Sequence, residues 1–236
     1  MKWRSLQESS PEPGTRRLYE IFAERRELIS RYVPAEIQAL HARVVEELKQ
    51  SGIERRAPKT GDWAPAFELP DRDGTLVRST DLLSRGPLVL CFIRGRWCPF
   101  CVGQMEAMNA IVPELDQRSA SLLAISPQNP HQSSLMADQH KLRFRLLSDS
   151  GSQVSRQFGL VYQVPGYQKE VYRRAFVNLP FLNGDNTWEL PVPATFVIGR
   201  AAGDPVARVL FASVNPDYTE RPEPADILSR ITELLP

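Results

Sequence analysis

The sequence predicts an α/β fold in which a mixed central sheet carries helices on both faces. Three observations lead to this prediction. Apolar, strand-like runs alternate with helix-like segments through the second half of the chain. Two strand-like runs then follow one another directly, over 195–198 and 206–211, and a last amphipathic segment spans 224–235. Alternation of this kind, closed by a hairpin and a helix, is typical of a layered α/β domain.

The region ahead of the sheet indicates a tail followed by two helices. Residues 1–14 are polar and contain Pro and Gly, so we expect a loose tail. Apolar residues recur at helical spacing over 15–32 and again from Pro34 to Gly52. We favour a lid packed on the sheet over an arm that forms a dimer. A membrane-surface anchor is the least favoured of the three, because acidic and basic residues are interleaved along these helices.

These features predict two parts of the chain. Residues 1–57 are expected to form the N-terminal tail and helical extension, and residues 58–236 the sheet domain. Before the central strand, we expect a turn-rich linker over 57–65, a hairpin of short strands over 67–69 and 76–77, one helical turn over 80–83 and a buried strand over 87–93.

The remaining elements follow from local signals. Pro113 is expected to kink or end the helix after the central strand, because a mid-helix proline costs about 3 kcal/mol. Asn129 should cap a helix that begins at Pro130. We expect strands over 121–126 and 144–147, a helix over 151–158 closed by Gly159, and a turn over 199–205. Residues 160–190, rich in aromatic and turn residues, indicate a lid or binding insert, or a small satellite core.

The stretch Arg94–Cys101, RGRWCPFC, lies between the central strand and the next helix. It places Cys98 and Cys101 at the start of that helix, three residues apart, where a disulfide ring can close. The amide groups of a helix N-terminus favour the thiolate, which is the reactive form of cysteine. Arg94 and Arg96 are expected to add electrostatic support. We favour Cys98 as the more reactive sulfur because it should be exposed at the helix start.

Several functional classes are disfavoured by composition. The net charge is +1 over 236 residues with acids and bases mixed, so nucleic-acid binding is not expected. No apolar run has the roughly 20 residues of a membrane helix, and no signal peptide is seen, so we expect a cytoplasmic protein. The third cysteine, Cys91, lies in the central strand as a core residue, and the three histidines lack ligand spacing, so no metal site is expected.

The motifs GDWAPAFELPDRDG, RGRWCPFC, SLLAISPQ, LLSDSGSQVSRQFGL and ELPVPATFVIGR, in that order, resemble the peroxiredoxin-like branch of the alkyl hydroperoxide reductase and thiol-specific antioxidant family. The likeness runs from about residue 59 to the end. It implies a thioredoxin-like fold, an antioxidant redox role and no organic cofactor.

The motif itself departs from that family. Peroxiredoxins generally read Pro-x-x-x-Thr-x-x-Cys, and the match places Cys101 at the peroxide-attacking cysteine, Cys98 at the threonine and Arg94 at the proline. An arginine expected before a late strand is absent from the residues Val192-Pro193-Ala194-Thr195. Trp97-Cys98-Pro99-Phe100-Cys101 resembles the thioredoxin site instead. This resemblance to the thioredoxin site implies that Pro193 is cis and faces the cysteines. Trp97, Val192, Pro193 and Thr195 would then line the side of the site that faces the substrate. An ordinary trans proline, an inward strand residue at Thr195 and a packed Trp97 are the plainer alternatives.

Three functions stay open. The first is hydroperoxide reduction through a Cys98/Cys101 dithiol-disulfide cycle, with an external reductant such as a thioredoxin-type protein or glutathione. The second is thioredoxin-like reduction of a disulfide substrate, in which Cys98 attacks and Cys101 resolves. The third is a non-catalytic redox sensor or binding module. The first is favoured, and the N-terminal helices leave a homodimer open.

Overall fold

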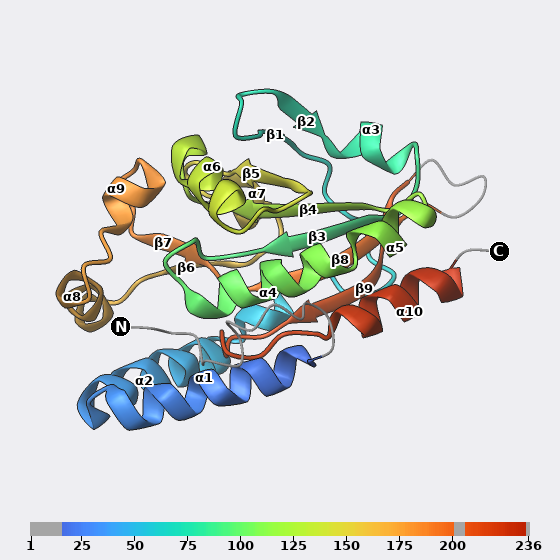
Figure 1. Cartoon of the computed structure of the whole chain (residues 1–236). Helices are drawn as coiled ribbons and strands as arrows, with labels where there is room; N and C mark the ends of the chain where they lie inside the picture. Colours follow the sequence, from blue (N-terminus) through green and yellow to red (C-terminus); the bar gives the residue numbers. More distant parts are fainter. Residues whose placement is uncertain (1–15, 201–205, 235–236) are drawn as a thin grey trace.

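The computed structural model describes residues 16–200 and 206–234, and a five-stranded mixed sheet lies at its centre (Figure 1). Its strands lie in the order β5-β4-β3-β8-β9. Their bounds are β3 Leu88–Phe92, β4 Ser121–Ser126, β5 Arg145–Ser148, β8 Ala194–Gly199 and β9 Arg208–Val214. β3, β4 and β5 run parallel, whereas β8 is antiparallel to β3 and β9 is antiparallel to β8. The predicted mixed sheet is confirmed.

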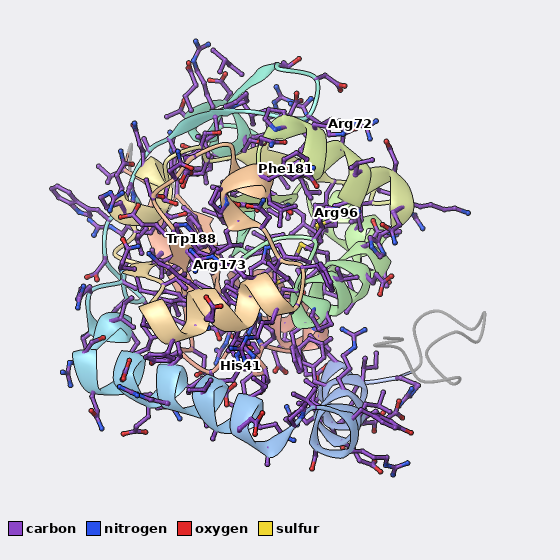
Figure 2. The ribbon with its side chains drawn as sticks, turned by 90° about the vertical axis from the view of Figure 1, so that its left-hand side faces the viewer. His41, Arg72, Arg96, Arg173, Phe181 and Trp188 are labelled. Atoms are coloured by element: carbon purple, nitrogen blue, oxygen red, sulfur yellow. The ribbon has the colours of Figure 1, made fainter. Side chains whose placement is uncertain are left out.

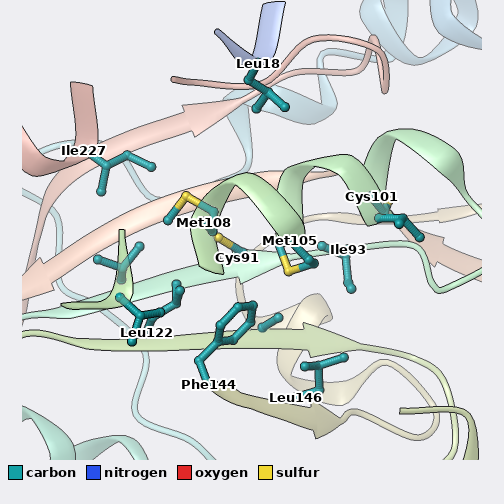
Figure 3. Packing of buried hydrophobic residues seen from close by; sticks show 14 of the residues in the cluster. Leu18, Cys91, Ile93, Cys101, Met105, Met108, Leu122, Phe144, Leu146 and Ile227 are labelled. Carbon is teal, nitrogen blue, oxygen red and sulfur yellow. The ribbon is translucent and has the colours of Figure 1, made fainter. Parts of the chain in front are cut away.

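Different elements bury the two faces of this sheet. Side chains alternate along a strand, so Cys91 and Leu90 of β3 point to opposite faces. On the Cys91 face lie α4 (Pro99–Ala110), α6 (Pro130–Gln139) and α10 (Pro224–Leu234), and Figure 3 shows Met105, Met108 and Ile227 packed there. The Leu90 face is covered by α3 (Ser79–Leu83), α7 (Gln153–Gln157) and the hairpin of β1 (Glu68–Pro70) and β2 (Leu76–Arg78).

Two N-terminal helices pack against the helix that follows β3. α1 (Leu18–Tyr32) contacts α4, and α2 (Ala35–Ser51) contacts α8 (Gly166–Arg174). Figure 1 shows the two helices side by side on the α4 side of the sheet. Leu18 and Phe22 of α1 are buried in the core beneath them. The helices therefore pack as predicted, but they lie on α4 and α8 instead of on the sheet. The predicted tail over residues 1–14 lies outside the described residues.

Residues 160–190 form a small folded unit. β6 (Val161–Gln163) pairs antiparallel with β7 (Glu189–Pro191), and α8 and α9 (Leu179–Asn183) lie between them in the sequence. Five buried side chains form a core of their own: Val164, Tyr172, Leu179, Leu182 and Leu190. The predicted satellite core is confirmed. Trp97 of the cysteine motif packs against it, so the unit lies beside the cysteines.

Local sequence signals predicted most helix ends. Asn129 caps α6, where its side-chain oxygen accepts a hydrogen bond from the Gln132 N–H at 3.1 Å. α4 ends at Ala110 and a new helix, α5 (Val112–Gln117), carries Pro113 in its first turn. The turn predicted over 199–205 falls largely outside the described residues. Among the helices of residues 16–200 and 206–234, none is long and apolar enough to cross a membrane.

Candidate active site

A tight strand-to-helix turn positions the two cysteines. Pro99 is the first residue of α4 and Cys98 is its N-cap, with the Cys98 N–H donating to the Gly95 carbonyl at 3.1 Å. Gly95 has a φ of +143°, and a β-carbon there would lie 2.8 Å from Trp97 Nε1. The turn thus needs glycine at this position. Cys101 lies in the first turn of α4, as expected.

Both sulfurs are buried, so the predicted exposure of Cys98 is wrong. Cys98 and Cys101 are each 0% exposed. The N-terminal extension covers this end of α4: Phe22 of α1 packs edge-on against Phe100, with ring centroids 5.0 Å apart. Arg25, also on α1, donates a hydrogen bond to the Pro99 carbonyl. Without the N-terminal helices the start of α4 would face solvent. In this protein α1 covers it.

Arg94 makes direct contact with the first sulfur. Its Nη2 donates to Cys98 Sγ at 3.0 Å, and the side chain is buried. The Tyr218 ring lies 3.8 Å from the guanidinium carbon, and Tyr172 Oη accepts from Nη1 at 3.4 Å. Burial opposes ionisation of Cys98. The hydrogen bond from the Cys101 thiol and the positive charges of Arg94 and Arg221 outweigh it and hold the pKa of Cys98 well below its usual value.

Cys101 has the opposite character. Burial, together with the hydrogen bond to Cys98 and the charge of the Cys98 thiolate, raises the pKa of Cys101 well above its usual value. Arg221, which lies between β9 and α10, approaches this second sulfur, with Nη2 3.9 Å from Cys101 Sγ. Of the two sulfurs, Cys98 is therefore the one that ionises more readily. The preference for Cys98 is supported by electrostatics rather than by exposure.

Arg96 turns away from the sulfurs. It is half-buried, and its Nη1 donates to Gln132 Oε1 of α6 at 3.3 Å. Its backbone N–H donates to Gln128 Oε1 at 2.8 Å. Arg94 and Arg96 flank Gly95, and their side chains point in different directions. The structure therefore brings Arg94 to the thiols and Arg96 to α6.

The predicted substrate-facing turn is buried. The Val192–Pro193 peptide bond is trans, so the prediction of a cis Pro193 is wrong. The chain runs straight from β7 into the sheet here. The Val192 N–H donates to the Leu160 carbonyl at 2.8 Å, and the Pro193 carbonyl accepts from the Asn215 N–H at 3.4 Å. The Val192 N–H is thus occupied and does not face the sulfurs.

Thr195 and Trp97 follow their plainer interpretations. Thr195 is 0% exposed and accepts a hydrogen bond from Gln104 Nε2 at 3.0 Å, beneath α4. Trp97 is half-buried, and its ring packs against Tyr172 at a centroid distance of 5.1 Å. Cys91 is a core residue as predicted, and burial raises the pKa of its thiol to about 12.

Sequence reasoning missed the residues that enclose Arg94. His41 of α2 lies between α2 and α8 (Figure 2), with its ring 6.4 Å from Tyr172 and 6.0 Å from Tyr218. Burial first, and the charge of Arg94 second, lower the pKa of His41 to about 4. Nothing in the sequence ties positions 41, 172, 218 and 221 to the cysteines, because the fold alone brings them together. The aromatic content of the insert was the one available signal.

Metal binding has no visible basis in the part of the chain that the structure describes. Within it, no group of three or more His, Cys, Asp or Glu side chains is arranged to hold a metal ion. All three cysteines are free thiols.

A thioredoxin-like sheet with a buried cysteine of lowered pKa at the start of the helix after its central strand defines a thiol redox protein. Comparison with known proteins gives its family. The model of the AhpC/TSA family matches residues 60–202, and the chain belongs to that family.

The relatives carry peroxiredoxin names. Peroxiredoxin Bcp of Escherichia coli strain K12 is 37% identical over 102 residues, which are 43% of this chain and 65% of that protein. The chain thus spans just under two thirds of this relative. A Mycobacterium tuberculosis protein named as a peroxiredoxin is 34% identical over 119 residues, 50% of this chain and 77% of that protein.

Solved structures show the same fold. The crystal structure of peroxidoxin BcpB from Mycobacterium tuberculosis has a TM-score of 0.56 and 27% identity, covering 76% of this chain and 99% of that one. Peroxiredoxin Q of Xanthomonas campestris has a TM-score of 0.54 and 17% identity, covering 71% of this chain and 90% of that one. These matches confirm the predicted thioredoxin-like fold of a peroxiredoxin.

Proposed function

We propose that this protein is a thiol peroxidase that reduces a hydroperoxide through Cys98 and Cys101. The observation that carries the proposal is the buried Cys98 sulfur held 3.0 Å from the Arg94 guanidinium, an arrangement that lowers the pKa of Cys98. A thiolate is the form of cysteine that attacks peroxide. Membership of the AhpC/TSA family and the names of the relatives support the same activity.

The reaction has two steps in this site. The Cys98 thiolate attacks the terminal oxygen of the hydroperoxide, the O–O bond breaks, and the alkoxide or hydroxide leaves and takes up a proton. Cys98 becomes a sulfenic acid. Cys101 then attacks that sulfur, the S–O bond breaks, and water leaves as the disulfide forms. Arg94 contacts the reacting sulfur throughout and offers a guanidinium donor to the departing oxygen.

Burial favours a small peroxide over a protein disulfide as the oxidant. Cys98 is 0% exposed, α1 covers the start of its helix through the contact of Phe22 with Phe100, and Tyr172 of α8 lies against Arg94. A protein substrate would have to bring its disulfide into contact with the Cys98 sulfur, and the groups that enclose Cys98 oppose this approach. A hydroperoxide has only to deliver one oxygen. The thioredoxin-like motif WCPFC is the feature that supports the alternative function, reduction of disulfides.

The reducing partner, assembly and location extend the proposal. We propose that an external dithiol, a thioredoxin-type protein or glutathione, reduces the disulfide after the site opens. The three free cysteines fit a reducing compartment such as the cytoplasm. We propose that residues 1–57 form an N-terminal extension to the redox domain of residues 58–236, and that its helices α1 and α2 cover the site, since Phe22 and His41 both lie against it. A homodimer stays a prediction.

The test compares the wild type with Cys98→Ser and Cys101→Ser. Reduced protein is mixed rapidly with hydrogen peroxide, quenched, and examined by mass spectrometry for sulfenic acid and disulfide. We expect fast oxidation in the wild type and in Cys101→Ser, which stops at sulfenic acid. Cys98→Ser should react no faster than an ordinary thiol.

Two results would contradict the proposal. If Cys98→Ser keeps fast oxidation and Cys101→Ser loses it, the attacking sulfur is Cys101, as in the family motif. If no form reacts faster than a free thiol while a small disulfide is reduced through Cys98, the protein is a disulfide oxidoreductase.

A further inference from the structure

Arg221 is a second arginine at the cysteine pair; its charge helps to lower the pKa of Cys98, but the sulfur it contacts directly is that of Cys101. Its guanidinium lies 3.9 Å from Cys101 Sγ, whereas Arg94 holds Cys98. The two arginines come from different parts of the chain, the turn after β3 and the loop between β9 and α10. Each sulfur therefore has an arginine of its own.

A buried polar chain orients Arg221. Its Nε donates to Gln104 Oε1 at 2.9 Å, and Gln104 Nε2 donates to Thr195 Oγ1 at 3.0 Å. Gln104 and Thr195 are both 0% exposed. The Gln104 amide has one favoured orientation, because reversing it would place its NH2 donor against the Nε–H donor of Arg221. Gln104 thus fixes where the Arg221 guanidinium lies.

The loop that carries Arg221 is fixed as well. The Asp217 N–H donates to Asn215 Oδ1 at 2.8 Å, and the Thr219 N–H donates to Asp217 Oδ1 at 2.9 Å. Asn215 Nδ2 donates to Glu220 Oε2 at 2.8 Å. The same loop places Tyr218 over Arg94. One rigid loop therefore shapes the surroundings of both sulfurs.

The first step changes the charge that Arg221 faces. In the reduced protein the Cys98 thiolate balances the positive charge, and its own negative charge opposes ionisation of Cys101. When Cys98 becomes a neutral sulfenic acid, that opposing charge disappears while both guanidinium groups remain. The positive charge then favours the thiolate of Cys101.

We propose that Arg221, positioned by Gln104, activates Cys101 for the resolving step, after Cys98 has been oxidised. The inference rests on the proposed function and adds a residue to it. The step is balanced: the S–S bond forms, the S–O bond of Cys98 breaks, and the hydroxide leaves as water with the proton that Cys101 gives up. Arg221 stays protonated and transfers nothing.

The experiment separates the two steps in time. Reduced wild type, Arg221→Met, Arg221→Lys and Gln104→Leu are oxidised with hydrogen peroxide, and rapid quench with mass spectrometry counts sulfenic acid and disulfide. Arg230→Met is the control, since Arg230 is exposed on α10 and paired with Glu233 at 3.0 Å. Circular dichroism confirms that each variant is folded.

We expect Arg221→Met to slow disulfide formation at least about tenfold, whereas sulfenic acid formation falls less than about threefold because Arg94 still contacts Cys98. The pH dependence of the second step should move to higher pH. Arg221→Lys should restore part of the rate. In a double variant, Gln104→Leu should slow disulfide formation little beyond Arg221→Met alone, because Gln104 acts through Arg221. Arg230→Met should match the wild type.

Two outcomes would overturn the inference. Disulfide formation at the wild-type rate in Arg221→Met would show that Cys101 needs no second arginine. Equal slowing of both steps would assign Arg221 to Cys98. The second step is also started from a mixed disulfide made on Cys98 with a small aromatic disulfide, so a protein that fails to reduce peroxide still tests Arg221.

Discussion

Replacing Arg94 by methionine removes the charge next to the attacking sulfur while keeping a side chain of similar length. Arg94 Nη2 lies 3.0 Å from Cys98 Sγ. At an effective dielectric constant of about 20, two unit charges at this separation interact by about 5.5 kcal/mol. At about 1.4 kcal/mol per pKa unit this corresponds to about four units. Since Arg221 remains and water can enter, we expect about half, a rise of about two units in the pKa of Cys98.

The assay follows the thiolate and the reaction in the same samples. Ultraviolet absorbance of the thiolate against pH gives the pKa, with Cys98→Ser as the baseline. Stopped-flow oxidation by hydrogen peroxide, repeated across pH, gives the rate and its pH dependence. A rise of about two units in the pKa of Cys98 moves the midpoint of the pH–rate profile up by about two pH units, and below the wild-type midpoint it lowers the thiolate fraction, and hence the rate, about 100-fold. Arg94→Lys keeps the charge and loses the planar fork, so its rate should lie between those of the wild type and Arg94→Met.

Arg96→Met is the matched control. Arg96 lies two residues along the same turn, but it donates to Gln132 and not to a sulfur. Its rate and the pKa of Cys98 should stay close to the wild type. A pKa of Cys98 in folded Arg94→Met within about half a unit of the wild-type pKa would refute the electrostatic argument, since a lost contact at 3.0 Å must cost more than this.

Three further predictions follow from the surroundings of the site. The unfolded chain binds a proton at His41 below pH 6.5 and the native protein only near pH 4, so the free energy of unfolding should fall by up to about 3 kcal/mol as the pH drops through this window. Urea titrations across pH test this, and His41→Phe should flatten the dependence. Phe22→Ala should lower the free energy of unfolding by about 3–5 kcal/mol in the same assay, because the ring is 1% exposed. Gly95→Ala should lower the melting temperature, since the new carbon meets Trp97 at a left-handed φ, whereas Gly166→Ala, whose added carbon would meet nothing within 4 Å, should change it little.

The fold was predictable because its signals are local. Strand β4 spans the predicted residues 121–126, and the cap at Asn129 lies where the sequence places it. These features depend on side-chain patterns within a few residues of one another. The insert was recognisable from its aromatic residues and its length. Its helices were not, because their packing depends on a small core assembled from distant positions.

The cysteine pair was predictable and its environment was not. The motif between β3 and α4 identifies Cys98 and Cys101, and Gly95 separates the two arginines. Which arginine faces the thiols depends on contacts made by other parts of the chain. Arg96 binds Gln132 of α6, and Arg94 packs against Tyr172 and Tyr218. The covering of the start of α4 depends on α1, through Phe22 on Phe100. Contacts between residues far apart in the chain decide both, and the sequence carries no local sign of them.

The two departures from the peroxiredoxin motif make physical sense together. The family pattern places the attacking cysteine at position 101 and an arginine before the late strand, where this chain has a buried trans Pro193. Arg94 occupies the proline position of that motif, and it contacts Cys98 rather than Cys101. An attacking thiol needs a nearby positive charge to ionise in a buried site. If the arginine that stabilises the thiolate moves to the turn after β3, the charged sulfur must move with it, from the first turn of α4 to its N-cap. Cys101, left within the helix, is then placed to attack the oxidised Cys98 from one turn away.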